Sequence, residues 1–285
     1  MGTNYASKVI KVALAEVGYL EKGSNSNLDS KTGNAGYRNY TKYSRDFDKN
    51  YPTFYNGKKS GAEWCDIFVD WCMVKAFGVE AALKLLGQPK KSCGAGCSWS
   101  ALYYQKIPSF YRYPEVGDQI FFRDGNGSPC HTGIVYKVDS TYVYTIEGNT
   151  SDKAGVVANG GCVAKKKYKL NSSSIHGYGR PKYDKEPSKT YSGVFPNITV
   201  TYYVKDKKGN KVKKNRHYLK KGDKGTQVAH LQRFLNWYGG YKLDVDGDFG
   251  NLTLNAVKDF QDKNKLVVDG LFGKKSLAKA KTIKK

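Results

Sequence analysis

The hydrophobic period changes once along the first 183 residues, and this change constrains the fold more than any other feature. Apolar residues first recur with helical spacing, in segments 9–17, about 65–77, 80–86 and about 98–106. They then alternate as in strands, in segments 119–122, 132–138, 142–147, 163–168 and 176–179. Helices followed by strands predict an α+β domain with an antiparallel sheet, spanning residues 1–183.

The rest of the chain is expected to contain a linker and a second domain. Residues 21–62 are polar and indicate a long loop inside the first domain, whereas residues 184–218, rich in lysine, indicate a linker. Gly209-Asn210 could turn a small β-hairpin within that linker. Residues 219–285 predict a small all-α domain of three helices, because VDGDFG at 245–250 recurs as VDGLFG at 268–273 and each copy precedes a helical pattern.

The chain is strongly basic. Its 48 Lys and Arg residues against 25 Asp and Glu give a net charge of +23, of which +10 falls in residues 1–183 and +13 in residues 184–285. A basic surface attracts polyanions such as nucleic acid, anionic membranes or an anionic cell wall, although a solvated surface without a partner has the same composition. No apolar stretch is long enough to span a bilayer, so no membrane insertion is expected.

Cys65 and His131 are the candidate catalytic pair. Cys65 begins an apolar helical pattern, where the helix dipole favours a thiolate, and Phe68, Val69 and Cys72 share its helix face. A histidine that arrives from a distant strand can pair with that thiolate and produce an activated nucleophile for acyl transfer. The alternative is that Cys65, like Cys72, is a buried core thiol.

Two polar residues could orient His131. If residues 139–141 form the loop between the two strands, residue 131 lies opposite 149 and diagonal to 147. His131, Glu147 and Asn149 then share one face of the sheet, and Glu147 or Asn149 could accept a hydrogen bond from the imidazole. A register slip of one residue would remove this arrangement.

No metal or other cofactor is expected. Cys93, Cys97 and Cys130 lack the spacing of zinc knuckles and are interpreted as structural thiols. The acidic cluster at 244–248 lacks the glycine and glutamate of a calcium loop, and the repeat favours structural turns. Asp46 and Asp48 do not form a recognisable calcium motif either. The other histidines are interpreted as surface or partly packed residues: His176, His217 and His230.

Five segments, taken together and in order, resemble a known family. They read EWCDIFV at 63–69, VGDQIFF at 116–122, HTGIV at 131–135, IEGNT at 146–150 and GYGRP at 177–181. They are similar to the cysteine, histidine-dependent amidohydrolase/peptidase (CHAP) domains of bacterial cell-wall lytic enzymes. The resemblance implies a papain-like fold, with Cys65 as nucleophile, His131 as base, Glu147 as the residue that orients the histidine and Asn149 beside it.

The C-terminal region carries a second resemblance. LKKGDKG at 219–225, VAHLQRFL at 228–235 and the two Asp-Gly-x-Phe-Gly turns resemble the three-helix peptidoglycan-binding domain attached to many such enzymes. Together the two resemblances imply a bacteriophage endolysin or a related autolysin acting on peptidoglycan of a Gram-positive wall. The start of the chain has no secretory pattern, so synthesis in the host cytoplasm and later release to the wall are expected.

The resemblance implies cleavage of an amide bond through Cys65 and His131, with the backbone N–H of Cys65 as a candidate oxyanion donor. An N-acetylmuramoyl-L-alanine amidase is favoured, and an endopeptidase that cuts stem or bridge peptides is the alternative. Two other classes remain: a wall-binding protein without activity, and a nucleic-acid-binding protein. The intact Cys, His and Glu disfavour the first, and the lack of a DNA- or RNA-binding motif disfavours the second. The sequence does not indicate an oligomeric state.

Overall fold

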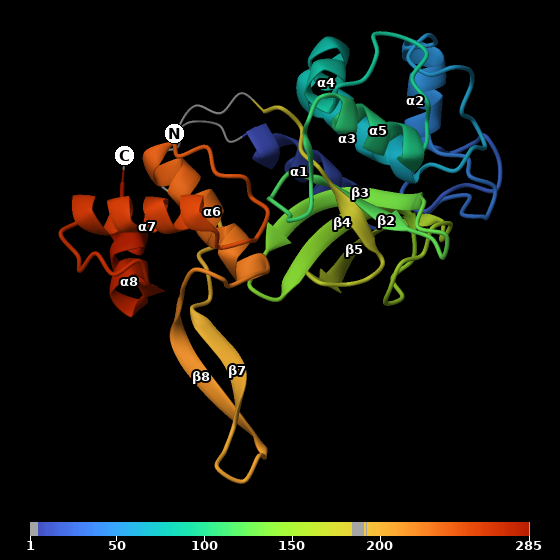
Figure 1. Ribbon diagram of the computed structural model, residues 1–285. Coiled ribbons are helices and arrows are strands. Elements are labelled where there is room, and N and C mark those ends of the chain that lie inside the picture. The colour runs from blue at the N-terminus through green and yellow to red at the C-terminus, as the bar shows by residue number, and fades with distance from the viewer. Residues whose placement is uncertain (1–4, 184–190, 192, 285) are drawn as a thin grey trace. The chain divides into compact units, whose positions relative to one another are not determined.

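The computed structural model describes residues 5–183, 191 and 193–284, and they form two compact units. The first unit extends through residue 185 and the second begins at residue 186 (Figure 1). None of the helices in the described residues is both long and apolar enough to cross a membrane. Each unit has a core of its own, so each is described separately.

The first unit packs helices against an antiparallel sheet (Figure 1). The helices are α1 (Tyr5–Glu16), α2 (Lys42–Asn50), α3 (Cys65–Phe77), α4 (Val79–Leu86) and α5 (Cys97–Lys106). The strands are β1 (Phe110–Tyr111), β2 (Gln119–Arg123), β3 (Pro129–Val138), β4 (Tyr142–Thr150), β5 (Cys162–Lys169) and β6 (Ile175–Gly179). They lie in the order β1-β6-β2-β3-β4-β5. The α+β prediction for this region is therefore confirmed.

Two apolar clusters fill this unit because successive strand residues point to opposite faces of the sheet. The larger cluster joins α1, α3, α4 and α5 to sheet residues such as Phe121, Ile134 and Ile146. A smaller cluster contains alternate strand residues such as Phe122 and Val135. Helix α3 lies centrally, and ten of its thirteen residues are buried.

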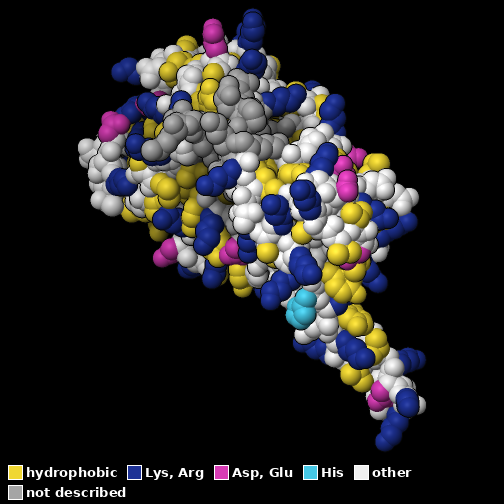
Figure 2. All heavy atoms as spheres, turned by 90° about the vertical axis from the view of Figure 1, so that its left-hand side faces the viewer, with side chains coloured by type: hydrophobic (Ala, Val, Ile, Leu, Met, Phe, Trp, Pro, Cys, Tyr) yellow, Lys and Arg dark blue, Asp and Glu magenta, His cyan; other side chains and the backbone are white. Residues whose placement is uncertain are grey.

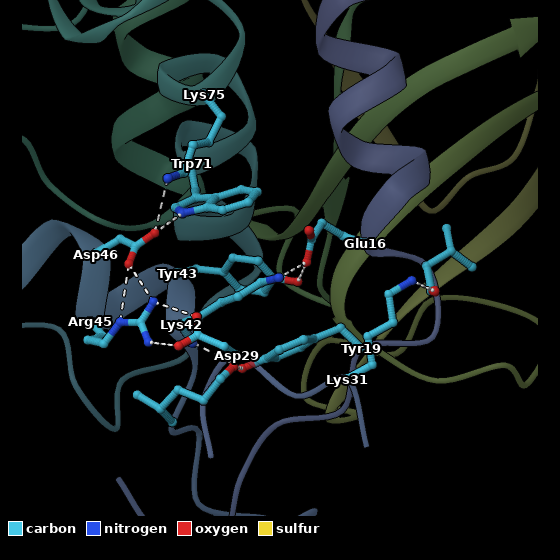
Figure 3. A network of polar contacts seen from close by, with 12 residues as sticks. Glu16, Tyr19, Asp29, Lys31, Lys42, Tyr43, Arg45, Asp46, Trp71 and Lys75 are labelled. Carbon is cyan, nitrogen blue, oxygen red and sulfur yellow. Dashed lines mark hydrogen bonds and ion pairs between the residues drawn. The ribbon is translucent and has the colours of Figure 1, made fainter. Parts of the chain in front are cut away.

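The prediction of a continuous loop over residues 21–62 is wrong, because α2 lies within it. Its apolar content is low, and a short stripe of two buried residues, Tyr43 and Phe47, is the only apolar signal in it. These two side chains pack in the core, and polar contacts also hold the helix against α1 and α3 (Figure 3). Tyr43 Oη donates to Glu16 at 2.8 Å, Asp46 accepts a hydrogen bond from Trp71 Nε1 at 2.8 Å, and Lys42 pairs with Glu16 at 2.7 Å. These contacts depend on residues far away in sequence, which a local pattern does not reveal.

The β3–β4 register differs from the prediction near the turn but agrees with it near the site. Val138 pairs with Val143, one residue beyond the pairing that a 139–141 loop requires. The register then shifts between Val135 and Lys137, so that Ile134 pairs with Ile146. A β-bulge thus compensates for the longer turn. Continuing the latter register brings residue 131 opposite 149, as predicted.

The second unit combines three helices with a β-hairpin (Figure 1). The helices are α6 (Thr226–Gly239), α7 (Asn251–Lys263) and α8 (Lys274–Thr282), close to the three predicted helices. Strands β7 (Thr199–Lys205) and β8 (Lys211–Leu219) form the hairpin, and the short β9 (Phe272–Gly273) pairs with the end of β8. The prediction of three helices for residues 219–285 is therefore confirmed, and the hairpin that precedes them belongs to the same unit.

The hairpin lies within residues 184–218, where the sequence predicts a linker with a small hairpin. Ile198 and Leu219, on either side of it, are buried in the apolar core of the second unit. The segment from 198 onward is therefore part of that unit, and the predicted linker is too long. Residues 184–190 lie outside the described residues.

The two copies of the hexapeptide repeat form the same turn, and a buried glutamine holds each one. Gln232 donates through Nε2 to Asp246 at 2.7 Å and accepts from Gly247 N at 2.9 Å. Gln261 donates to Asp269 at 2.8 Å and accepts from Gly270 N at 2.9 Å. The repeated turns are structural, as predicted.

Candidate active site

Cys65 is the first residue of α3, and its side chain is 5% exposed. The preceding Trp64 makes no side-chain cap, so backbone N–H groups and the positive end of the helix dipole remain available to a negative charge. Trp64 itself is fixed by a hydrogen bond of 2.9 Å from its Nε1 to Glu21. Helix and indole together hold the thiol in one position.

A second thiol lies against Cys65. Cys97 begins α5, and its Sγ is 3.6 Å from Cys65 Sγ. The hydrogen bond from Cys97 lowers the pKa of Cys65 well below its usual range; burial opposes this, and His131 and the backbone N–H of Asp66 assist it. The same contact and burial raise the pKa of Cys97. These opposite pKa shifts favour Cys65 as the thiolate and Cys97 as the thiol that donates to it.

His131 is fully buried and is held by Glu147. Its Nε2 lies 3.0 Å from Glu147 Oε2, and Glu147 is also completely buried. Thr145 Oγ1 and Tyr168 Oη donate to the same carboxylate, the latter at 3.1 Å. The imidazole also stacks against Phe122, with ring centroids 5.8 Å apart. Packing and hydrogen bonds thus fix the orientation of the ring.

The other imidazole nitrogen is left for the thiol. Among the described residues, no group lies within hydrogen-bond distance and geometry of His131 Nδ1. Burial disfavours the charge on His131, but the Cys65 thiolate and Glu147 together raise its pKa to about 9. The raised pKa of His131 and the lowered pKa of Cys65 are the signature of a thiolate–imidazolium pair.

Two glycines allow the elements around the site to pack closely together. A Cβ on Gly133 would lie 2.5 Å from Glu147 Cγ, so a side chain there would displace the carboxylate. A Cβ on Gly148 would lie 2.6 Å from Phe68 Cβ and would push β4 away from α3. Neither glycine has a positive φ; both are required by close approach rather than by backbone conformation. Both lie in segments that carry the family resemblance.

A buried polar network joins the elements that carry the two thiols and the histidine. Asp66, next to Cys65, accepts from Ser100 of α5 at 2.8 Å and from Gln119 of β2 at 3.0 Å. Gln119 also donates to Thr132, the neighbour of His131, at 3.1 Å. Burial raises the pKa of Asp66 well above its usual range. The network fixes α3 and α5 against the sheet.

Asn149 lies apart from the contacts described so far. It is fully buried with φ +54°, and its Oδ1 accepts from Gly161 N at 3.4 Å. Within the described residues its Nδ2 has no partner, and no hydrogen bond joins it to His131 or Glu147. The structure therefore brings Cys65, His131 and Glu147 together, and in the described residues no hydrogen bond joins Asn149 to that set.

No group of metal-ligating side chains occurs in the described part of the chain. Asp46 contacts Arg45, Trp71 and Lys75, and Asp48 accepts two backbone hydrogen bonds at the 59–60 turn. His230 is only 1% exposed, so its interpretation as a surface or partly packed residue is wrong. It lies on the buried side of α6.

Sequence reasoning missed two residues in the first turn of α5. It interpreted Cys97 as a structural thiol, because nothing in its local pattern indicates that α5 begins beside α3. It did not single out Trp99, which lies in the first turn of α5 and is 53% exposed. Its ring stacks on Tyr103, with centroids 6.4 Å apart. An exposed tryptophan two residues from Cys97 is a candidate surface for a sugar or peptide.

The second unit has a pocket of about 270 Å³. Its walls come from His217 and Tyr218 at the base of the hairpin and from the second repeat turn with the helices around it. Leu266, Asp269 and Lys274 lie among those wall residues. The pocket therefore offers apolar, acidic and basic groups within one small volume.

Comparison with known proteins identifies both units. Residues 57–149 match the CHAP domain family, and residues 224–279 match the PG_binding_1 family of peptidoglycan binding domains. A spore cortex-lytic enzyme of Bacillus cereus is 43% identical over 58 residues, which cover 20% of this chain and 22% of that enzyme. The chain thus matches about a fifth of the length of this curated relative.

Two solved structures also match in part. The crystal structure of a Burkholderia AP3 phage endolysin is 38% identical over 23% of this chain and 25% of its own, with a TM-score of 0.22. A peptidoglycan-binding protein from Clostridioides difficile, solved in complex with glutamine hydroxamate, is 18% identical over 48% of this chain and 70% of its own, with a TM-score of 0.22. The family matches carry the assignment: this chain contains a CHAP domain followed by a peptidoglycan-binding domain.

Proposed function

We propose that this protein is a peptidoglycan hydrolase that cleaves an amide bond through Cys65, His131 and Glu147. One arrangement carries the proposal: a thiol at a helix N-terminus and a buried imidazole shift each other's pKa, and the Nε2 of that imidazole lies 3.0 Å from a buried carboxylate. That arrangement has the roles of a cysteine nucleophile, its base and the residue that orients the base. The match to the CHAP family spans residues 57–149, which include all three residues, and supports the same proposal.

The mechanism begins with the Cys65 thiolate attacking the amide carbonyl carbon. The oxygen of the tetrahedral intermediate lies at the start of α3, where the backbone N–H of Cys65 can stabilise its charge. His131 donates its proton to the leaving amine, which gives a thioester on Cys65. Neutral His131 then takes a proton from water, whose oxygen attacks the thioester and releases the acid. Glu147 keeps the imidazole oriented throughout, and Cys97 supports the thiolate form of Cys65.

The second unit anchors the enzyme on the wall. Its match to a peptidoglycan-binding family and its pocket beside the second repeat turn support this role. Anchoring keeps the catalytic unit near an insoluble substrate and raises the local concentration of scissile bonds. The proposed partner is therefore peptidoglycan, of a Gram-positive type, reached after release from the cytoplasm of a host bacterium.

We favour an N-acetylmuramoyl-L-alanine amidase, with a peptide-cutting endopeptidase as the alternative. Mass spectrometry of purified Gram-positive peptidoglycan, digested by the wild type and by Cys65→Ala, distinguishes them. Free stem peptides with amino-terminal alanine, made only by the wild type, indicate an amidase. Muropeptides cut within the peptide indicate an endopeptidase.

Cys72→Ala is the matched control, since Cys72 is a buried thiol on the same helix with a pKa raised by burial. It should digest peptidoglycan like the wild type if it remains folded. Equal product from Cys65→Ala would contradict the nucleophile assignment. An absence of product from every wall type tested would instead support a binding protein without activity.

A further inference from the structure

The β7–β8 hairpin has a large excess of basic over acidic residues. Residues 199–219 contain seven basic residues and one acidic residue, a net charge of +6. The hairpin extends away from the helices of its unit, and lysine and arginine side chains follow its length (Figures 1 and 2). Most residues in both of its strands are exposed. A two-stranded ribbon of this kind gains little stability of its own in water.

The strand register concentrates cations on one face. Lys205 lies directly opposite Lys211, and Tyr203 lies opposite Lys213, all on the same side of the ribbon. Like charges in directly opposed positions destabilise a hairpin. Lys211 Nζ lies 4.6 Å from the Tyr203 ring centroid, so the ring is within cation–π distance of one of these lysines. We name Tyr203, Lys205, Lys211 and Lys213 the basic face.

Within the described residues, no carboxylate pairs with the lysines of this face. In the described residues none of its lysines forms an ion pair, and the nearby Arg216 pairs with Asp223 outside the hairpin. Asp206, the acidic residue of the turn, accepts hydrogen bonds from the backbone of Lys208 and Asn210 at 2.8 Å each. The positive charge is therefore available to a ligand from outside the chain.

The hairpin continues the surface of the unit that matches a peptidoglycan-binding family. Leu219 at the end of β8 lies in the core of that unit, so the hairpin base is fixed to it. His217 and Tyr218 line the pocket whose other wall residues fall within the matched region 224–279. A ligand of the basic face must therefore be found beside peptidoglycan.

We propose that the basic face binds a phosphate-bearing anionic polymer of the bacterial wall, next to the peptidoglycan held by the rest of the unit. This inference rests on the proposed function of the second unit as a wall anchor. Repeating phosphates match a row of lysines, and the release of their counterions favours binding at low salt. Tyr203 supplies a flat ring for the sugar or polyol between phosphates. Nucleic acid has the same charge but no reason to lie beside the pocket.

The test is sedimentation of the full chain with Gram-positive wall sacculi before and after removal of their phosphate polymers with hydrofluoric acid. The Cys65→Ala background keeps the sacculi intact. We expect Lys205→Gln/Lys211→Gln/Lys213→Gln to weaken binding to untreated sacculi about tenfold and to leave binding to stripped sacculi unchanged. The dependence of log affinity on log salt should become shallower by about 2.

The matched control is Lys265→Gln/Lys279→Gln/Lys281→Gln, which removes three exposed charges elsewhere in the same unit. It should bind both kinds of sacculi like the parent chain. Equal binding by the hairpin variant and the parent to untreated sacculi would overturn the proposal. Tighter binding of the parent to duplex DNA than to the wall, lost in the hairpin variant, would also overturn it and would assign the face to nucleic acid.

Catalysis is measured separately, with Cys65 restored and soluble peptidoglycan fragments as substrate. The hairpin variant should cleave these fragments at the wild-type rate, because its lysines belong to the second unit and the proposed catalytic residues to the first. A chain that is inactive but still binds phosphate-bearing wall through these lysines would contradict the hydrolase proposal and leave this inference standing. A chain that is active but binds untreated and stripped sacculi equally well would support the hydrolase proposal and contradict this inference.

Discussion

The two units satisfy their buried polar groups in opposite ways. In the first unit, Asp66 of α3 is paired with Ser100 of α5 and Gln119 of β2, residues 34 and 53 positions away. In the second, Gln232 and Gln261 each hold a turn 8 to 15 residues further on, and the two sets of contacts repeat. A network built from distant segments supports one unique site, whereas a network built from a local repeat supports a scaffold. The difference should be visible when each network is broken.

The largest effect is expected at Glu147. Glu147→Gln removes the charge beside His131, so the pKa of His131 should fall from about 9. The thiolate–imidazolium pair then loses its proton at lower pH, and the basic limb of kcat/KM should move down from about pH 9. We expect kcat/KM at neutral pH to fall about 100-fold, which is about 2.7 kcal/mol. The pH dependence of digestion of soluble fragments measures both.

Glu80→Gln serves as the control, since Glu80 is an exposed residue of α4. It should match the wild type at every pH, and wall binding by the second unit should be equal in all three proteins. An unchanged basic limb in Glu147→Gln would mean that Glu147 does not set the protonation of His131.

Substituting the glutamine of either repeat turn should lower the stability of the second unit by a similar amount and leave the first unit unchanged. Gln232→Met and Gln261→Met keep the length of the side chain but leave an aspartate and a glycine N–H without their partner. Each should lower the free energy of unfolding of the second unit by about 2 kcal/mol, the usual penalty for unsatisfied buried groups. Calorimetry should show the change in the transition of the second unit alone. A cost below about 0.5 kcal/mol in both variants would show that the glutamines do not hold the turns.

The same comparison explains what the sequence reveals. The hexapeptide repeat, the helices of both units and the antiparallel strands follow from local periodicity, so their prediction needs no tertiary contact. Helix α2 was missed because its apolar stripe is short, with Tyr43 and Phe47 as its buried apolar residues, and because hydrogen bonds to the distant α1 and α3 help to hold it. The contact of His131 with Glu147 was predictable from strand parity, since the bulge near Tyr136 compensates for the longer turn. The Cys65–Cys97 contact was not, because it depends on how α5 packs against α3.

His230 offers a pH test within the second unit. Burial and the Arg233 guanidinium lower the pKa of His230 to about 3. The unfolded chain binds a proton below pH 6.5 while the folded unit does not, so stability is complete above pH 6.5 and falls as the pH drops toward 3. Between pH 7 and pH 5 the second unit should lose about 2 kcal/mol through this residue.

His230→Leu removes that dependence, and His217→Gln, which changes an exposed histidine of the same unit, should keep it. Calorimetry at pH 7 and pH 5 gives the comparison. If the wild type and His230→Leu lose the same stability between these values, the titration of His230 in the unfolded chain is not the cause.

The smallest effect is expected at Cys97. Its substitution tests whether the contact between the Cys97 and Cys65 thiols, which has no equivalent in the repeat turns, affects catalysis in the first unit. Cys97→Ala removes the thiol 3.6 Å from the proposed nucleophile, so the pKa of Cys65 should rise. The acidic limb of kcat/KM should move to higher pH, with a loss of about tenfold below that limb, about 1.4 kcal/mol, and little change near pH 8. Cys97→Ser keeps a donor in the same place and should restore the wild-type limb.

A packing role alone would not shift a titration. The rate at which iodoacetamide alkylates Cys65, followed peptide by peptide against pH, reports the thiolate directly and does not depend on substrate. Cys72→Ala controls for the loss of a buried thiol elsewhere on α3. If the alanine variant, the serine variant and the wild type alkylate with the same pH dependence, Cys97 only fills space beside the nucleophile. If alanine alone shifts, the convergence of α3 and α5 is part of the chemistry, and the distant contact sets the charge of the site.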